Sequence, residues 1–142
     1  MDSDLRLELT DSPSREDNHQ VELGLDAYNT RFAEPHNHRP LSIFLRDPEG
    51  KIAAGLVGGT HWGWLHVELL WVYERLRGQG WGSRILKAAE DEARARGCRH
   101  ADLDTLSFQA LPFYEKQGYV IWGVLEDYPP GHKRYYVKKD LA

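Results

Sequence analysis

The sequence holds little that would indicate a secreted, membrane or nucleic-acid-binding protein. Its 142 residues include one cysteine, Cys98, so an internal disulfide cannot form. No stretch approaches the roughly 20 apolar residues of a membrane span, and the first residues lack the basic and apolar segments of a secretory leader. Lys and Arg number 18 against 22 Asp and Glu, so the basic excess typical of nucleic-acid binders is missing. These absences favour a cytoplasmic protein that binds neither nucleic acid nor membrane.

Histidine is present but its spacing does not indicate a metal site. His36 lies close to His38, and His61 lies close to His66, yet neither pair has a third ligand at a recognisable spacing. We therefore expect no bound metal. The length suits a single domain spanning residues 1–142, because a chain of this size buries about two-thirds of its unfolded surface.

Hydrophobic periodicity predicts an α/β fold with one mixed sheet. Residues 5–9 alternate as a half-buried first strand, and Ser12 with Pro13 is expected to begin a helix that ends near Phe32. Residues 41–47 and 51–60 flank a DPEG turn as a hairpin, and residues 62–72 continue the sheet. After these strands we expect a helix over 83–97, a strand over 100–106 and a short helix ended by Gly118. Residues 119–126 and 133–139 are two last strands.

The helix over residues 83–97 shows the strongest pattern. Apolar residues recur every four positions: Ile85, Ala89 and Ala93. Glu90 and Arg94 are spaced to form an exposed ion pair, and a second such pair lies two residues further on. Gly97 is placed to end the helix.

The turn RGQGWG, residues 77–82, lies between an apolar strand and this helix. Its three glycines are each one residue apart: Gly78, Gly80 and Gly82. Glycine allows positive φ and close approach of the backbone to a ligand, and a helix start offers unpaired N–H groups. The turn is therefore predicted to bind a phosphate group.

Two motifs resemble those of the GCN5-related N-acetyltransferase (GNAT) superfamily. The first is Arg77, Gly80 and Gly82, which is similar to the superfamily's Gln/Arg-x-x-Gly-x-Gly/Ala turn. The second is SFQALPFYEKQGY, residues 107–119, with the following matching positions: Ala110, Tyr114, Gly118 and Tyr119. The resemblance implies a mixed, mostly antiparallel sheet of six to seven strands flanked by helices, splayed at a bulge in the strand before the glycine turn.

The resemblance also implies the activity and the cofactor site. Acetyl-CoA would be the cosubstrate, and its acetyl group would pass to an amine of a small molecule or peptide by direct attack in a ternary complex. Ser107 stands where many members carry an asparagine that contacts the cofactor, and Gln109 is an alternative donor. The implied cofactor-binding residues are Leu70, Trp71, Val72, Arg77, Gly78, Gln79, Gly80, Trp81, Gly82, Ser83, Ser107 and Gln109.

Glu68 and Tyr114 are the candidate catalytic residues. Glu68 interrupts an apolar strand and would share a face with His66 and Leu70, where partial burial would raise its pKa towards that of a general base acting directly or through water. A plain ion pair with a neighbouring Arg or Lys is the alternative. Tyr114 matches the tyrosine that protonates the leaving thiolate in similar proteins, and an aromatic core residue is its alternative.

The acceptor site and the rival functions depend on less specific signals. The resemblance places the acceptor between residues 28–38 and 126–132, where Glu34, Glu126 and Asp127 with Glu68 would attract a cationic amine. A non-catalytic acyl-CoA-binding regulatory module is one rival, and a nucleotide-binding domain is a second, although the turn lacks the GK[ST] ending of a P-loop.

The apolar last strands favour a homodimer formed through their edge.

Overall fold

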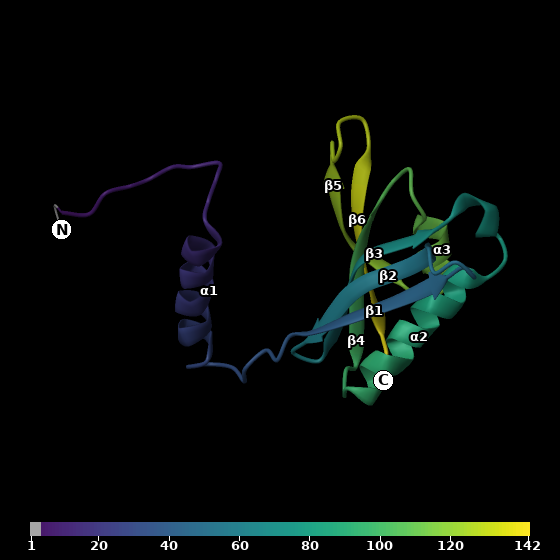
Figure 1. The fold of residues 1–142 in the computed structure, drawn as a ribbon, viewed down its shortest axis with the longest axis horizontal. Coiled ribbons are helices and arrows are strands. Elements are labelled where there is room, and N and C mark those ends of the chain that lie inside the picture. The colour runs from purple at the N-terminus through teal and green to yellow at the C-terminus, as the bar shows by residue number, and fades with distance from the viewer. Residues whose placement is uncertain (1–3) are drawn as a thin grey trace. The chain divides into compact units, whose positions relative to one another are not determined.

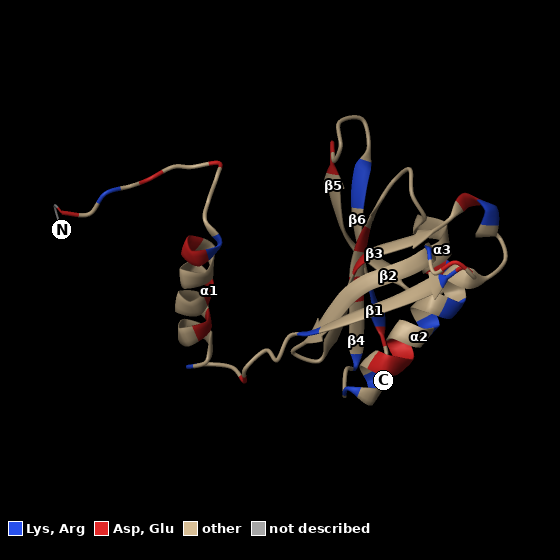
Figure 2. Cartoon of the chain, in the orientation of Figure 1, with Lys and Arg blue, Asp and Glu red and all other residues tan. Residues whose placement is uncertain are grey.

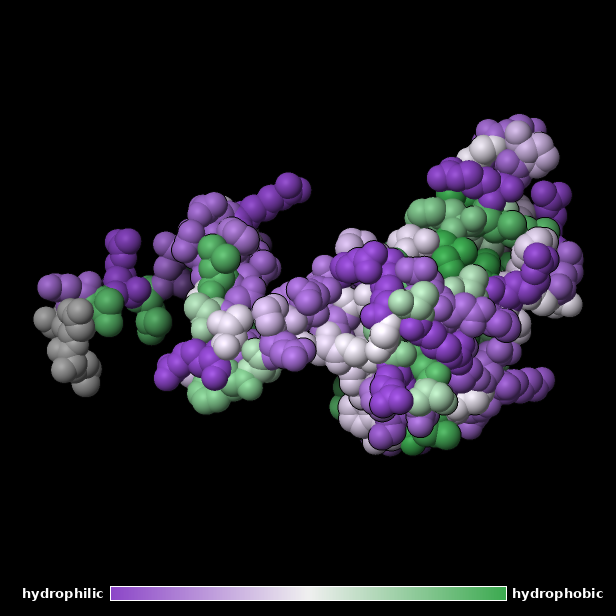
Figure 3. Space-filling view, turned by 90° about the horizontal axis from the view of Figure 1, so that it is seen from below, coloured by the Kyte–Doolittle hydropathy of each residue, from purple (hydrophilic) through white to green (hydrophobic). Residues whose placement is uncertain are grey.

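The structure is a computed structural model that describes residues 4–142 as two compact units, residues 4–35 and residues 36–142. The first unit contains α1 (Arg15–Asn29), which begins two residues later than the sequence predicts. Its N-cap is Ser14, whose hydroxyl accepts a hydrogen bond of 3.1 Å from the amide of Asp17. No residue of α1 is buried, and its apolar side chains lie at the surface, Val21 and Leu25 among them (Figure 3).

The predicted first strand over residues 5–9 is wrong. These residues form no regular structure, and the side chains of Leu7 and Leu9 are fully exposed. Their alternation is real, but a strand exists only when a neighbouring strand accepts its backbone hydrogen bonds. The strands that pair in the described chain all lie between residues 39 and 140.

The second unit is built on one six-stranded sheet with the order β1-β2-β3-β4-β6-β5 (Figure 1). Its strands are β1 (Arg39–Arg46), β2 (Ile52–His61), β3 (Trp64–Val72), β4 (His100–Leu106), β5 (Val120–Glu126) and β6 (Lys133–Asp140). Every neighbouring pair is antiparallel except β3 and β4, which run parallel. The fold class predicted from the sequence, a mixed and mostly antiparallel sheet flanked by helices, is confirmed.

The hydrophobic core lies between this sheet and two helices, α2 (Trp81–Ala95) and α3 (Leu111–Lys116). The apolar stripe of α2 is buried as predicted, and it packs against Leu56, Leu65 and Leu103 of the sheet. Gly97, with a φ of 87°, follows the end of α2 as expected. Among the described residues, no helix is both long and apolar enough to span a membrane.

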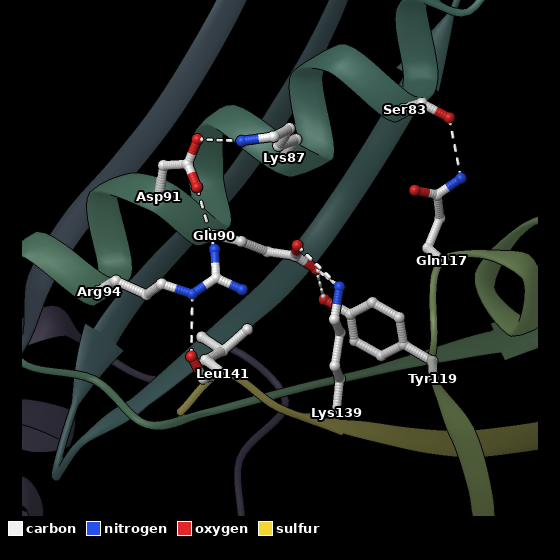
Figure 4. A network of polar contacts seen from close by, with 9 residues as sticks. All are labelled: Ser83, Lys87, Glu90, Asp91, Arg94, Gln117, Tyr119, Lys139 and Leu141. Carbon is white, nitrogen blue, oxygen red and sulfur yellow. Dashed lines mark hydrogen bonds and ion pairs between the residues drawn. The ribbon is translucent and has the colours of Figure 1, made fainter.

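Glu90 of α2 has a different environment from the exposed ion pair predicted for it. Its carboxylate is almost fully buried, and it accepts hydrogen bonds from the Tyr119 hydroxyl at 2.8 Å and from Lys139 Nζ at 2.9 Å (Figure 4). Arg94 donates instead to Asp91, at 2.9 Å. The helix presents Glu90 to the sheet, so its partners come from distant strands rather than from the next helical turn. Charged residues of both signs lie along α2 (Figure 2).

Candidate active site

The glycine turn connects β3 to α2 through a short 3-10 helix, η1 (Glu74–Leu76). Gly78 and Gly80 adopt positive φ angles of 76° and 86°, a conformation that disfavours any residue with a Cβ. Gly80 is the N-cap of α2, and no side chain caps the helix there. The first amides of α2 therefore lack an intrahelical partner and point at the space beyond the turn, as in an anion-binding site.

Side chains hold this turn in place from both ends. Arg77 Nε donates to the carbonyl of Val72 at 2.9 Å, which fixes the turn to the end of β3. Gln79 Nε2 donates to the carbonyl of Arg75 at 3.1 Å. Ser83, in the first turn of α2, accepts a hydrogen bond of 2.8 Å from Gln117 after α3 (Figure 4). The amides are thus held in position before any ligand arrives.

A β-bulge in β3 comes before the turn. Leu69 pairs with Val57 of β2, but Val67 pairs with the next β2 residue, Gly58, so Glu68 is an extra residue. A Cβ on Gly58 would lie 2.3 Å from the carbonyl oxygen of His66, so the close approach of the two strands at the bulge requires glycine.

Beyond the bulge, β3 and β4 separate. Only Trp64–Val67 of β3 pairs with β4, and its partners there are His100–Leu103, although both strands continue for several residues. The amide of Tyr73 donates to Ala53 on the β2 side, and backbone groups alternate along a strand. The N–H and C=O groups of Leu70 and Val72 therefore face the gap towards β4, whereas those of Trp71 face β2. This is the splayed geometry expected from the sequence.

The bulge changes the environment predicted for Glu68. Before it, Leu65 and Val67 face the core, and after it Leu70 and Val72 face the core. Leu70 is therefore not on the face of His66, and the expected partial burial of Glu68 is wrong, because the carboxylate is exposed to solvent. One inserted residue reverses which side chains face the core, and a prediction from strict alternation along the strand does not include such an insertion.

Tyr114 lies on α3 on the core side of the sheet. Its side chain is 7% exposed, and its ring packs edge-on against Phe113 and Tyr119. The hydroxyl makes no hydrogen bond to any residue that the structure describes. Burial, and secondly the Asp104 carboxylate on β4, raises the pKa of Tyr114 to about 12, so the phenol carries its proton at neutral pH.

The side chains of Ser107 and Gln109 form hydrogen bonds that hold the loop after β4. Ser107 Oγ accepts from the amide of Lys133 at 3.1 Å and lies 3.3 Å from Nδ1 of His132, which ties this loop to the start of β6. Gln109 Oε1 accepts from the amide of Leu106 at 2.9 Å. Both side chains therefore have partners within the protein, and Gln109 retains its amide donor.

A groove that the sequence did not reveal lies on the face of the sheet away from α2. Its volume is about 610 Å³, and its lining residues come from five strands: His61, Trp64, His66, Asp102, Trp122 and Lys138. Nδ1 of His66 lies 3.1 Å from Oδ1 of Asp102. The signal was present in the alternation of Asp102 and Asp104 with buried residues of β4, but only the sheet order places Asp102 beside His66.

The gap between β3 and β4 and the uncapped start of α2 are the geometry that the resemblance implies for an acetyltransferase. The sequence model of the acetyltransferase (GNAT) family matches residues 5–119, so the chain belongs to this family.

Known proteins are similar over most of the chain. It is 42% identical to blasticidin-S acetyltransferase of Streptomyces morookaense over 107 residues, which is 72% of this chain and 79% of the relative. It is 39% identical to an acetyltransferase of Agrobacterium fabrum over 132 residues, or 92% and 96% of the two chains. The crystal structure of an Agrobacterium tumefaciens protein superposes with a TM-score of 0.89 and 36% identity, covering 96% of this chain and 99% of that one.

Proposed function

We propose that this protein is an N-acetyltransferase that moves the acetyl group of acetyl-CoA to an amine of a small molecule or peptide by direct attack in a ternary complex. The observation that carries the proposal is the gap between β3 and β4, which comes just before the glycine turn and the uncapped start of α2 and is faced by backbone groups of β3 that do not pair with β4. The family membership and the similarity to blasticidin-S acetyltransferase support a small-molecule amine as acceptor.

The cofactor would bind along this gap. The amides of residues 77–83 would hold the pyrophosphate, because a helix start combines free N–H donors with a positive dipole end. The N–H and C=O of Leu70 and the N–H of Val72 would pair with the pantetheine arm as an added strand does, whereas the carbonyl of Val72 already accepts from Arg77. The amide of Leu70 would polarise the thioester carbonyl, and its direction makes it a better candidate than that of Trp71.

Tyr114 would donate its proton to the leaving thiolate. The amine nitrogen attacks the carbonyl carbon, the C–N bond forms and the C–S bond breaks, and the thiolate takes up the phenolic proton. The nitrogen loses a proton as the intermediate collapses, and this proton restores Tyr114. Glu68, which is exposed at the bulge, would attract the cationic amine to the gap, and Glu126 and Asp127 would extend this acidic surface.

A thermal melt tests cofactor binding first. Acetyl-CoA should raise the melting temperature, whereas ATP and NAD should not, because ligands stabilise only the state that binds them. Release of the coenzyme A thiol in the presence of an amine panel then tests turnover. Stabilisation by acetyl-CoA without turnover of any amine would favour the non-catalytic regulatory module, and stabilisation by ATP or NAD alone would contradict the proposal.

We also propose that two copies pair through the edge strand β5. It lies at one end of the sheet order and exposes the following apolar side chains: Val120, Ile121, Trp122, Val124 and Leu125. An apolar edge strand of this kind offers unpaired backbone groups to a second copy.

A further inference from the structure

The groove on the face of the sheet away from α2 contains an ordered histidine–carboxylate pair. His66 of β3 and Asp102 of β4 are direct neighbours in the parallel register, and their side chains lie 3.1 Å apart. Both are about one-third exposed, so they are reachable from the groove. A carboxylate can only accept, so Nδ1 of His66 carries the hydrogen, and Nε2 keeps a free lone pair.

The pair lies close to the point where the strands split. His66 is two residues before Glu68, the bulged residue, and β3 leaves β4 after Val67. Asp104, two residues beyond Asp102, influences both His66 and Tyr114 electrostatically. His66 faces the groove, whereas Tyr114 lies in the core on the other side of the sheet.

Two tryptophans form apolar walls of the groove. Trp64 is stacked on His100 with ring centroids 4.6 Å apart, and Trp122 packs against Tyr136 at 5.5 Å. These contacts hold the indoles in place, and such rings favour flat, apolar ligands by stacking. The polar groups of the groove are the histidine–carboxylate pair, His61 and the exposed Lys138.

We propose that this groove binds the acceptor amine through a flat, ring-containing body, and that Nε2 of His66 takes the proton of its ammonium group while Asp102 holds the imidazole in position. The inference rests on the proposed function, since it names the base and the acceptor class of that reaction. It assigns the proton transfer to His66 rather than to Glu68. One proton passes from the ammonium nitrogen to Nε2 and then to solvent, which leaves a neutral amine to attack the thioester.

The charges that face His66 predict a pH dependence. The hydrogen bond that His66 donates to Asp102 raises the pKa of His66 above its usual 6.5, burial opposes this, and the carboxylate charges of Asp102, Asp104 and Glu68 add to the increase. The groove also contains Lys138 and His61, and burial lowers the pKa of His61. A base must be deprotonated, so kcat/KM should rise with pH through a value above the usual histidine pKa.

The test compares single substitutions in the full-length protein, with the pH profile as the main readout. H66Q should lower kcat by about 10²–10³-fold and abolish the acidic limb of the kcat/KM profile, while acetyl-CoA still raises the melting temperature. D102N should move this limb to lower pH, because the imidazole loses its anionic partner. H61Q should retain the limb, and H19Q, on the exposed surface of α1, should match the parent.

Tryptamine and spermidine serve as probes of the acceptor class. Tryptamine should have at least a tenfold higher kcat/KM than spermidine, and W122A should remove this preference. Equal use of both amines by the parent, or a preference that survives in W122A, would overturn the assigned acceptor class.

The same measurements distinguish an error in the role of His66 from an error in the proposed acetyltransferase activity. If H66Q retains the limb and a kcat within twofold of the parent, or if E68Q alone abolishes the limb, the assignment of His66 is wrong although the enzyme is an acetyltransferase. A parent protein that acetylates no amine in the panel overturns the proposed function itself.

Discussion

Among single residues, Tyr114 combines a buried ring with a hydroxyl that makes no hydrogen bond to the described protein. Tyr119, also buried, has the opposite arrangement, because its hydroxyl donates to Glu90 at 2.8 Å. The two phenols differ by one polar contact, and the proposed proton donor is the one without a hydrogen-bond partner in the described protein.

Substituting each tyrosine by phenylalanine should therefore give opposite results. Y114F keeps the ring packing and loses the proton donor, so kcat should fall about 10²-fold with little change in stability. Y119F leaves a buried carboxylate with one donor fewer, so the free energy of unfolding should fall by about 1.5–3 kcal/mol with kcat retained. Urea unfolding and thiol release measure the two effects. A Y114F enzyme with parental kcat would contradict the role of Tyr114.

Among the elements, the start of α2 serves both the helix and the cofactor. Its N-cap is Gly80, so neither a side chain nor an acidic residue neutralises the first turn. A helix gains about 0.3–1 kcal/mol from a carboxylate at this end. The absence of one is consistent with a site that is kept for a ligand anion.

Placing a carboxylate at Ser83 should improve the helix and impair the site. S83D should leave stability unchanged or slightly higher, because the new carboxylate meets the positive end of the dipole and can still accept from Gln117. Acetyl-CoA affinity should fall at least tenfold, because the carboxylate repels the pyrophosphate. S83N, of similar size but neutral, is the control. Equal affinities of S83D and S83N by calorimetric titration would show that the pyrophosphate binds elsewhere.

At the scale of the whole molecule, two buried phenols should make the free energy of unfolding fall at alkaline pH. Burial raises the pKa of Tyr119 and raises that of Tyr114 to about 12, whereas an unfolded tyrosine titrates near pH 10. Above about pH 10 the unfolded chain therefore holds fewer protons than the native protein, so the free energy of unfolding falls as pH rises.

The share of Tyr114 in this loss can be measured by substitution. Between about pH 10 and pH 12 the unfolded chain gives up the Tyr114 proton while the native protein keeps it, so the free energy of unfolding should fall by about 2–3 kcal/mol by about pH 12. Urea unfolding between pH 8 and pH 12 should therefore show a shallower decline for Y114F than for the parent. Parallel declines would contradict the burial of this phenol in the native state.

The proposed dimer is also a property of the whole molecule. V124K puts a charge in the middle of the exposed edge strand β5, so it should convert a dimer into a monomer in sedimentation experiments. S42K, on the opposite edge strand β1, should leave the assembly unchanged. A parent protein that sediments as a monomer, or a V124K dimer, would contradict pairing through β5.

The sequence by itself determined the elements whose signal is local. The strand over residues 100–106 and the glycine-led start of α2 follow from alternation, periodicity and the backbone freedom of glycine, which act over a few neighbouring residues. The two motifs identified the family for the same reason, because each is a short run of residues. A local pattern was insufficient for residues 5–9, where alternation occurs without a partner strand.

Only the tertiary structure decided which distant residues meet. Glu90 pairs with Lys139 across 49 positions, and His66 meets Asp102 across 36, because the sheet order brings these strands and α2 together. The single extra residue at Glu68 reversed the face of the strand that follows, which changed a predicted half-buried base into an exposed carboxylate. Side-chain spacing along the chain determines local structure, whereas burial and ionisation depend on neighbours that only the packed sheet supplies.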